Sequence, residues 1–486
     1  MPQAESQTAT SQQCWECRRR RLVCDATHPV CTKCRVARIV CPGYADKKPL
    51  KWLAPGQVTS RSRGRNRKPT SPVGGGPGVA EHPGLLLPPP TLQKLELRDD
   101  TCDIVEALAY YNTRLYPDAI SHQLAPNPFI IPIPSLHLIP ASIVHALVSV
   151  AISHRLFQIP RGASQSKALS GARSRLYHHR GIAIRLLNEL VGSEQTRSGD
   201  VTIASVYALL VSVLQQSTEP PCWRPHAEFI VTLVGLRAPL PSFVRSSPHM
   251  QVTILAFLTI GILANTTSPP LRQFPPCLDP ETTGLVAELY GQSYYPSFPC
   301  PKPLFLHIIT INNLRSQVAA CRPHLVPNMA TDVTRTLAQI EAFSPEDWAS
   351  SQPSLREDWA LIGHVFRSAV ALYCIKSLHG AVVFLQSSGI KATKTEHAKT
   401  LLALLKEAQA RPHVRRCMAW PLVVAGVDAT GASVDARAYV ADELSEMSRD
   451  QGTGNLLVAR DVLRRFWASR ALEWDDCFRE PYALVV

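Results

Sequence analysis

The sequence CWECRRRRLVC at residues 14–24 recurs as CTKCRVARIVC at residues 31–41. The six cysteines of the two copies follow the spacing C-x2-C-x6-C-x6-C-x2-C-x6-C and are Cys14, Cys17, Cys24, Cys31, Cys34 and Cys41. Outside the cysteines, the copies match at Arg18 and Arg35, at Arg21 and Arg38, and at two apolar positions. This internal repeat predicts one small folded unit made of two equivalent halves.

Two cysteines with two residues between them are typical of zinc sites, because the short spacer lets both sulfurs reach one metal ion. Two separate four-coordinate zinc ions would need eight sulfurs. Either one zinc is therefore bound with two cysteines spare, or two zincs share two bridging sulfurs, and the repeat favours sharing. Three disulfides would require an oxidising compartment, and residues 1–10 carry neither the basic nor the apolar region of a secretion signal.

The repeat resembles the fungal binuclear zinc cluster transcription factors. The resemblance covers the six cysteines, the arginine run after the second cysteine, Asp25 after the third and Pro29 before the fourth. It implies two zinc ions bridged by Cys14 and Cys31, one completed by Cys17 and Cys24 and the other by Cys34 and Cys41. It also implies a nuclear protein that binds double-stranded DNA. Val23 departs from the family, whose members commonly have a basic residue at this position.

The excess of positive charge is concentrated at the start of the chain. Residues 1–70 contain 15 Lys and Arg against 4 Asp and Glu, which accounts for +11 of the net charge of +13. Two zinc ions and six thiolates would lower this by only two charges. A polyanion is therefore the expected partner of this region.

Each half of the repeat is expected to form a short helix that begins at its first cysteine. We expect Leu22 and Ile39 to make apolar contacts between the halves, and Trp15 to be a packing residue. A unit this small buries almost no apolar core. Its stability must come from the metal, at about 10 kcal/mol or more for structural zinc sites.

A short helix rich in arginine suits the major groove of DNA, where Arg binds guanine O6 and N7 through two hydrogen bonds. The family resemblance narrows the expected sites to short triplets of the CGG type. We expect Arg20 and Arg21 to contact base edges. The remaining cations are expected mainly to contact phosphates: Arg18, Arg19, Lys33, Arg35 and Arg38.

The segments on either side of the repeat have compositions that disfavour folding. Residues 1–13 are polar and are expected to be disordered. Residues 42–99 are expected to form a linker, Pro- and Gly-rich from Pro69 to Pro90. Its first part is a basic arm, interpreted as a nuclear-import and phosphate-binding segment that contains Lys47, Lys48, Lys51, Arg61, Arg63, Arg65, Arg67 and Lys68.

Residues 100–486 carry apolar side chains at helical spacing, which predicts a large all-α domain. The expected helices are 101–116, 141–157, 166–191, 200–215, 225–238, 249–264, 306–320, 330–343, 355–378, 394–409 and 433–469, the last broken near Gly452. Proline-rich segments at 126–140, 239–248 and 269–303 are expected to be extended connections.

This second part resembles the fungal-specific transcription factor regulatory domain. The resemblance rests on three short motifs: Tyr110-Tyr111-Asn112 with Asn127-Pro128-Phe129, the stretch from His145 to His154, and Leu214-Gln215-Gln216-Ser217 continuing to His226. It is convincing over about residues 100–240. It implies that the helical domain regulates transcription together with the transcription machinery.

Catalysis receives little support, because the chain has no phosphate-binding loop, dinucleotide fingerprint, H-E-x-x-H motif or nucleophile elbow. We expect no catalytic residue. His178, His179 and His226 lack a further ligand at metal spacing and are interpreted as structural. The acidic and aromatic residues 474–478 are interpreted as a solvated helix end rather than a contact with the transcription machinery.

Three further expectations concern partners. Uninterrupted apolar runs are shorter than a bilayer requires, so no membrane partner is expected. A homodimer is possible, but Leu92, Leu95 and Leu97 do not continue as a coiled-coil repeat. The other eight cysteines are scattered and are expected to be reduced core residues. The alternative function is a zinc-stapled ligand or redox sensor whose helical domain carries the main activity.

Overall fold

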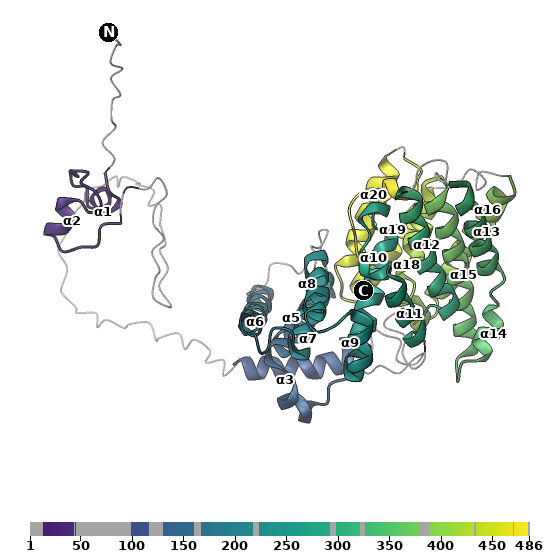
Figure 1. Ribbon diagram of the computed structural model, residues 1–486, viewed down its shortest axis with the longest axis horizontal. Helices are drawn as coiled ribbons and strands as arrows, with labels where there is room; N and C mark the ends of the chain where they lie inside the picture. Colours follow the sequence, from purple (N-terminus) through teal and green to yellow (C-terminus); the bar gives the residue numbers. More distant parts are fainter. Residues whose placement is uncertain are drawn as a thin grey trace, which may run out of the picture. The chain divides into compact units, whose positions relative to one another are not determined.

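The computed structural model describes residues 13–42, 44, 99–115, 130–159, 167–216, 223–291, 298–320, 326–379, 388–431, 434–469 and 471–484. The chain divides into two compact units, Met1–Leu92 and Gln93–Val486. Every regular element in the described residues is a helix, which confirms the all-α fold class (Figure 1). The predictions of disorder at 1–13 and of a linker at 42–99 fall outside the described residues except at 13, 42, 44 and 99, and the basic arm from Lys47 to Lys68 lies wholly outside them.

The N-terminal unit has two short helices, α1 (Trp15–Arg20) and α2 (Thr32–Val36). Each begins directly after the first cysteine of its half, as the sequence predicts. Cys14 caps α1, because its sulfur accepts a hydrogen bond from the Cys17 N–H at 3.4 Å. Cys31 caps α2 in the same way, through the Cys34 N–H at 3.4 Å. Cys14 and Cys31 therefore cap the two helices, and their sulfurs also lie close to each other.

The large unit is built from helices in two groups (Figure 1). The first group comprises α3 (Asp100–Tyr110), the π-turn η1 (Tyr111–Leu115), the 3-10 helix η2 (Ile133–Leu138), α5 (Ala141–Phe157), α6 (Lys167–Gly192), α7 (Asp200–Gln216), α8 (Trp223–Gly235) and α9 (Leu240–Ser246). The second comprises α10 (Gln251–Thr266), α11 (Pro280–Leu289), α12 (Lys302–Ala320), α13 (Val326–Glu341), α14 (Pro345–Ser350), α15 (Arg356–Leu378), α16 (Ser388–Gln409), α17 (Pro412–Arg415), α18 (Ala419–Asp428), α19 (Val434–Asp450), α20 (Asn455–Ala468) and α21 (Trp474–Cys477). Single 3-10 turns lie at Pro248–Met250, Pro270–Arg272, Pro275–Cys277 and Ala429–Gly431.

Helix α5 is the centre of the first group and packs against α3, α6 and α7. Small polar residues let α5 and α7 approach closely, since the hydroxyls of Ser142 and Ser205 are 2.7 Å apart. Helix α15 occupies the same place in the second group, between α12, α14, α16 and α18. The two groups are joined where the Gly454 N–H donates to the Gln215 carbonyl at 2.8 Å. One continuous apolar core runs through both groups.

The eleven helices predicted for residues 100–486 are all present, with ends shifted by a few residues. The prediction of extended proline-rich connections is wrong in part, because α9 lies within 239–248 and α11 lies within 269–303. Their prolines occupy the first turn, where proline needs no N–H partner and its fixed φ suits a helix. At α11, Asp279 caps the helix by accepting the Thr282 N–H at 2.8 Å, directly before Pro280. Proline starts these helices instead of preventing them.

Among the residues that the structure describes, two helical stretches are long and apolar enough to cross a membrane by length and composition, Pro248–Thr266 and Arg356–Leu378. They are longer than the uninterrupted apolar runs of the sequence, because mean hydropathy over 18 residues tolerates scattered polar side chains. In both stretches 78% of the window is buried inside the large unit. Their apolar side chains form the core of the helical domain, which accounts for their hydropathy.

Residues 471–484 are integrated into the core of the large unit, which corrects the prediction of a solvated helix end at 474–478. Trp474 and Phe478 are buried at 1% and 0% exposure. The Trp474 indole N–H donates to the Thr266 carbonyl at 2.7 Å. Asp475 forms an ion pair with Arg315 at 2.5 Å. Arg315 is itself 2% exposed and also donates to carbonyls at the end of α10.

Candidate metal and nucleic-acid site

The sulfurs of the repeat gather at the centre of the N-terminal unit. Cys14 Sγ lies 3.6 Å from Cys31 Sγ and 3.8 Å from Cys34 Sγ, and Cys17 Sγ lies 3.6 Å from Cys31 Sγ. Sulfurs bound to one tetrahedral zinc at about 2.3 Å are roughly 3.8 Å apart. Two sets of four sulfurs lie within 4.8 Å of one another: Cys14, Cys17, Cys24 and Cys31, and Cys14, Cys31, Cys34 and Cys41. Cys14 and Cys31 belong to both sets.

The donor chemistry also suits zinc. Cys14, Cys17, Cys31 and Cys34 are between 0% and 1% exposed. Burial raises the pKa of the Cys17 thiol to about 12, so thiolates at this depth need a compensating cation. A divalent metal deprotonates the thiols it binds and supplies that charge. The distances, the burial and the number of sulfurs together fit two zinc ions that share two cysteines.

The two halves repeat in backbone detail as well as in sequence. Each helix is followed by an arginine in the left-handed conformation, Arg21 at φ 56° directly after α1 and Arg38 at φ 51° in the turn after α2. The following residue closes the turn in both halves: the Leu22 N–H donates to the Cys17 carbonyl at 3.0 Å, and the Ile39 N–H donates to the Cys34 carbonyl at 3.0 Å. Non-glycine residues with positive φ are uncommon. Their recurrence at matched positions shows that the halves share one local structure.

Two residues outside the cysteines hold the halves together. The Asp25 carboxylate accepts the Thr32 N–H at 3.0 Å, so it covers the first turn of α2 from the loop after α1. Hydrogen bonds from Thr27 and Thr32 lower the pKa of Asp25, which keeps it ionised. Tyr44 packs against the sulfurs, with its hydroxyl 3.9 Å from Cys24 Sγ, and donates to the Thr27 carbonyl at 2.9 Å. The sequence analysis missed Tyr44, because no spacing rule connects it to the cysteines.

The four arginines of the run have different surroundings. The Arg19 guanidinium donates to both oxygens of Glu16, at 2.6 and 2.9 Å. The Arg18 guanidinium lies 5.2 Å from the centre of the Trp15 ring, which agrees with the packing role expected for Trp15. The exposed side chains of Arg20 and Arg21 make no hydrogen bond, ion pair or ring contact with the described residues. Two of the four cations are therefore fully available to a ligand.

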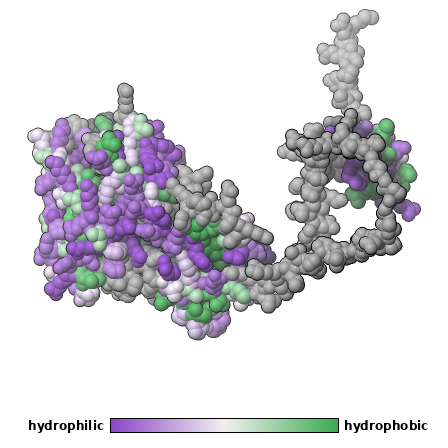
Figure 2. Space-filling model, turned by 180° about the vertical axis from the view of Figure 1, so that it is seen from behind, coloured by the Kyte–Doolittle hydropathy of each residue, from purple (hydrophilic) through white to green (hydrophobic). Residues whose placement is uncertain are grey.

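Leu22 and Ile39, for which an apolar contact between the halves was expected, lie outside the buried core of the unit. The two side chains are 37% and 39% exposed, and the core of the unit consists of sulfurs with Tyr44 beside them. Val23, Val36 and Val40 are 81%, 78% and 88% exposed. Figure 2 shows hydrophobic and hydrophilic side chains side by side on the surface of this unit. Bound metals, rather than buried aliphatic side chains, must therefore hold the fold.

In the large unit, two of the three histidines considered as metal ligands, His178 and His179, make hydrogen bonds. His179 is 0% exposed, with its Nε2 3.3 Å from Asp103 and its Nδ1 2.8 Å from His145 Nδ1. His178 pairs with Asp100 at 3.0 Å. Among the described residues, both groups of three or more ligands that could hold a metal consist of the repeat cysteines. The interpretation of these histidines as structural agrees with this arrangement.

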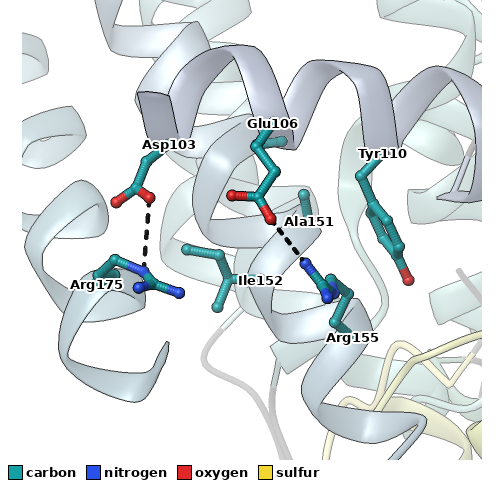
Figure 3. A pocket seen from close by; sticks show the side chains of 8 residues that line it. Asp103, Glu106, Tyr110, Ala151, Ile152, Arg155 and Arg175 are labelled. Carbon is teal, nitrogen blue, oxygen red and sulfur yellow. Dashed lines mark hydrogen bonds and ion pairs between the residues drawn. The ribbon is translucent and has the colours of Figure 1, made fainter. Parts of the chain in front are cut away.

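A small pocket lies between α3, α5 and α6 (Figure 3). Its charged side chains already pair across it: Glu106 with Arg155 at 3.2 Å and Asp103 with Arg175 at 3.6 Å. At its edge, the Tyr110 hydroxyl, from the first motif of the large unit, donates to Gln158 Oε1 at 3.1 Å and lies 2.9 Å from His154 Nδ1. Because the four charged side chains form ion pairs with one another, none is left to bind a ligand in this pocket. The two ion pairs therefore connect α3 to α5 and to α6.

Four buried cysteines of the large unit give no support to a redox role. Cys277, Cys300, Cys374 and Cys477 are buried, and burial raises the pKa of each thiol, to about 12 for Cys374. Thiols that stay protonated are poor nucleophiles and react slowly with oxidants. These four are core residues, as the sequence predicts, whereas the prediction is wrong for Cys102, which is exposed, and Cys417 is only partly buried.

Comparisons with known proteins cover both units. Residues 12–51 match the family described as "Fungal Zn(2)-Cys(6) binuclear cluster domain", and residues 106–484 match the "Fungal specific transcription factor domain". A curated relative from Leptosphaeria maculans, the "Phomenoic acid biosynthesis cluster-specific transcriptional regulator", is 33% identical over 483 residues, covering 97% of this chain and 89% of the relative. No solved structure matches the chain significantly.

Proposed function

Because the chain belongs to the fungal Zn(2)-Cys(6) transcription factors, which bind DNA and are not enzymes, we propose that its zinc cluster reads short CGG-like sites. In this proposal Cys14 and Cys31 bridge two zinc ions. Cys17 and Cys24 complete one site, and Cys34 and Cys41 complete the other. The two overlapping sets of sulfurs support this assignment. Membership of a transcription factor family implies the nucleus, and the basic arm from Lys47 to Lys68 is proposed to direct import.

The observation that carries the proposed DNA contacts is the difference among the arginines of α1. Arg20 and Arg21 reach base edges in the major groove, because their side chains have no partner within the described residues. Arg18, Lys33, Arg35 and Arg38 contact phosphates. Arg19 was expected to do so as well, but its two bonds to Glu16 compete with a phosphate. We therefore propose that Arg19 stabilises α1 through its ion pair with Glu16.

The helical domain regulates transcription by RNA polymerase II in this proposal, through contacts with the transcription machinery and with a possible second copy of the chain. The relative's name describes a regulator specific to one biosynthesis gene cluster. Its similarity extends over 97% of this chain, including the helical domain. We propose that this protein is likewise specific to a biosynthesis gene cluster. Genome-wide mapping of its bound sites tests this: sites confined to the promoters of one cluster are expected, and scattered sites would contradict it.

Replacing Arg21 by Ala tests base reading, and Arg19→Ala is the matched control on the same helix. Arg21→Ala should lose ~1–3 kcal/mol of affinity on a CGG-bearing duplex and little on a scrambled one, since a base contact discriminates between sequences. Arg19→Ala should preserve the ratio of the two affinities. Titration of both variants against both duplexes at two salt concentrations measures this. An unchanged ratio in Arg21→Ala would show that Arg21 contacts only phosphate.

A further inference from the structure

The two sets of sulfurs in the N-terminal unit differ in burial. Cys14, Cys17, Cys24 and Cys31 form one set, and all four are buried. The other set has three buried sulfurs, and its fourth ligand, Cys41, is only partly buried. A ligand that solvent reaches is open to protonation and to competing chelators, both of which weaken metal binding. The two sites are therefore unequal, although the sequence repeat alone makes them equivalent.

Tyr44 contacts Cys24, the most exposed ligand of the fully buried set. The Tyr44 hydroxyl lies 3.9 Å from Cys24 Sγ and donates to the Thr27 carbonyl at 2.9 Å. The centres of the Tyr44 and His28 rings are 4.3 Å apart. These contacts fasten the loop after Cys24 to the chain after the last cysteine. Hydrogen bonds and packing around a metal ligand hold it in place and limit the access of solvent.

The repeat supplies no equivalent contact for Cys41. Tyr44 is the third residue after Cys41, and the residue at the same position of the first half is Thr27. The Thr27 hydroxyl donates to the Asp25 carboxylate and lies 3.5 Å from the Thr32 hydroxyl. It makes no hydrogen bond to a cysteine within the part of the chain that the structure describes. The second half therefore protects a ligand of the first half, and Thr27 does not return that protection.

We propose that Tyr44 is a positioning residue that makes the zinc site of Cys17 and Cys24 the tighter of the two, so that the protein loses its zinc ions in a fixed order. The inference rests on the bridged arrangement proposed above. The site of Cys34 and Cys41 empties first, because a chelator reaches its partly buried ligand. A protein short of zinc then loses the structure of α2, which contains Cys34, before that of α1.

Removal of zinc from the full chain by EDTA tests the order. Native mass spectrometry follows the species with two, one and no zinc ions over time, and the one-zinc species should accumulate. This species is then treated with iodoacetamide and its peptides are mapped. Cys34 and Cys41 should be modified, whereas Cys17 and Cys24 should be protected, because only thiols without metal are free to react.

Tyr44→Phe tests the role of the hydroxyl, since it retains the ring that packs against His28. It should speed the loss of the second zinc by about ten-fold, as expected for a group that supports a metal ligand, and leave the loss of the first unchanged. A variant that only loosened the fold would speed both steps. The control is Tyr177→Phe on α6, where the tyrosine is 66% exposed, and it should change neither step.

Three results would overturn the proposal. They are loss of both zinc ions without a one-zinc species, modification of Cys17 and Cys24 in that species, and a Tyr44→Phe variant whose second step is no faster than that of the wild type. A single zinc ion in the untreated protein would contradict the bridged arrangement itself, and the order of loss with it. The Arg21→Ala titration decides the reading of DNA independently of all four results.

Discussion

At the level of single residues, Cys31 is both a shared metal ligand candidate and the cap of a helix. Its sulfur belongs to both sets of four, and it also caps α2 by accepting the Cys34 N–H. Removing it therefore takes a ligand from both proposed zinc ions and a cap from one helix. No other feature of the unit can compensate, because its core consists of sulfurs with one tyrosine beside them.

We predict that Cys31→Ala releases both zinc ions and unfolds the N-terminal unit, with loss of DNA binding. The matched control is Cys374→Ala. It removes a sulfur from α15 in the large unit, where Cys374 is 0% exposed. This control should keep two zinc ions and wild-type DNA affinity. Native mass spectrometry and duplex titration measure both properties. Retention of two zinc ions by Cys31→Ala would refute the bridged arrangement.

At the level of elements, the junction of α19 and α20 depends on a glycine. Gly452 has φ +60°, and a Cβ at this position would lie 2.3 Å from Cδ2 of His154. Gly452→Ala should lower the free energy of unfolding of the large unit by about 2 kcal/mol or more, from the left-handed backbone and the clash with the imidazole.

The control for this prediction is Gly284→Ala within α11, where an added Cβ meets nothing within 4 Å. Alanine should stabilise this helix by roughly 0.5–1 kcal/mol, because glycine loses more backbone freedom on folding. Chemical denaturation followed by circular dichroism measures both variants. If the two changes had the same sign, the close approach of Gly452 to His154 would not govern this junction.

The sequence predicts elements well where one face of a helix is apolar, and poorly where burial is complete. Helix α5 was predicted at its observed limits, 141–157. Helix α18 (AWPLVVAGVD) was missed, because seven of its first eight residues are apolar and its buried residues run without interruption, leaving no periodicity to detect. Helices α11 and α14 were missed for another reason: each begins with a proline after an Asp or Ser cap.

The site was predictable to the extent that spacing determines it. The repeat identifies the six cysteines and favours two shared sulfurs, whereas their division into two sets was implied by the resemblance to the zinc cluster family. The pairing of Glu16 with Arg19 could also have been found, because residues three apart on a helix are neighbours. The bond from Asp25 to the first turn of α2 and the packing of Tyr44 could not, because loops bring these residues into place and loop geometry follows no sequence period.

At the level of the whole molecule, the helical domain should lose stability in mild acid. Burial lowers the pKa of His145, His226, His307 and His397 below the ordinary value of 6.5. The unfolded chain then binds more protons than the folded one below that pH, so the free energy of unfolding falls as the pH falls.

We predict a lower melting temperature at pH 5.5 than at pH 7.5, measured on the full chain by far-ultraviolet circular dichroism. His307→Gln should reduce the difference, because burial alone lowers the pKa of His307. The test uses this pH range because the carboxylates titrate mostly below it. A melting temperature that rises on acidification would contradict the prediction.

The burial of residues 471–484 sets the order of events while the protein is being made. The Thr267 hydroxyl donates to the Tyr482 carbonyl at 2.9 Å, a bond between residues 215 positions apart in the chain. At about 5–20 residues per second, a ribosome needs about 10–40 s to travel between them. Throughout that interval the end of α10 and Arg315 are without their final partners. The helical domain therefore completes its core only after residues 471–484 have emerged from the ribosome, and chaperones would meet the incomplete core before then.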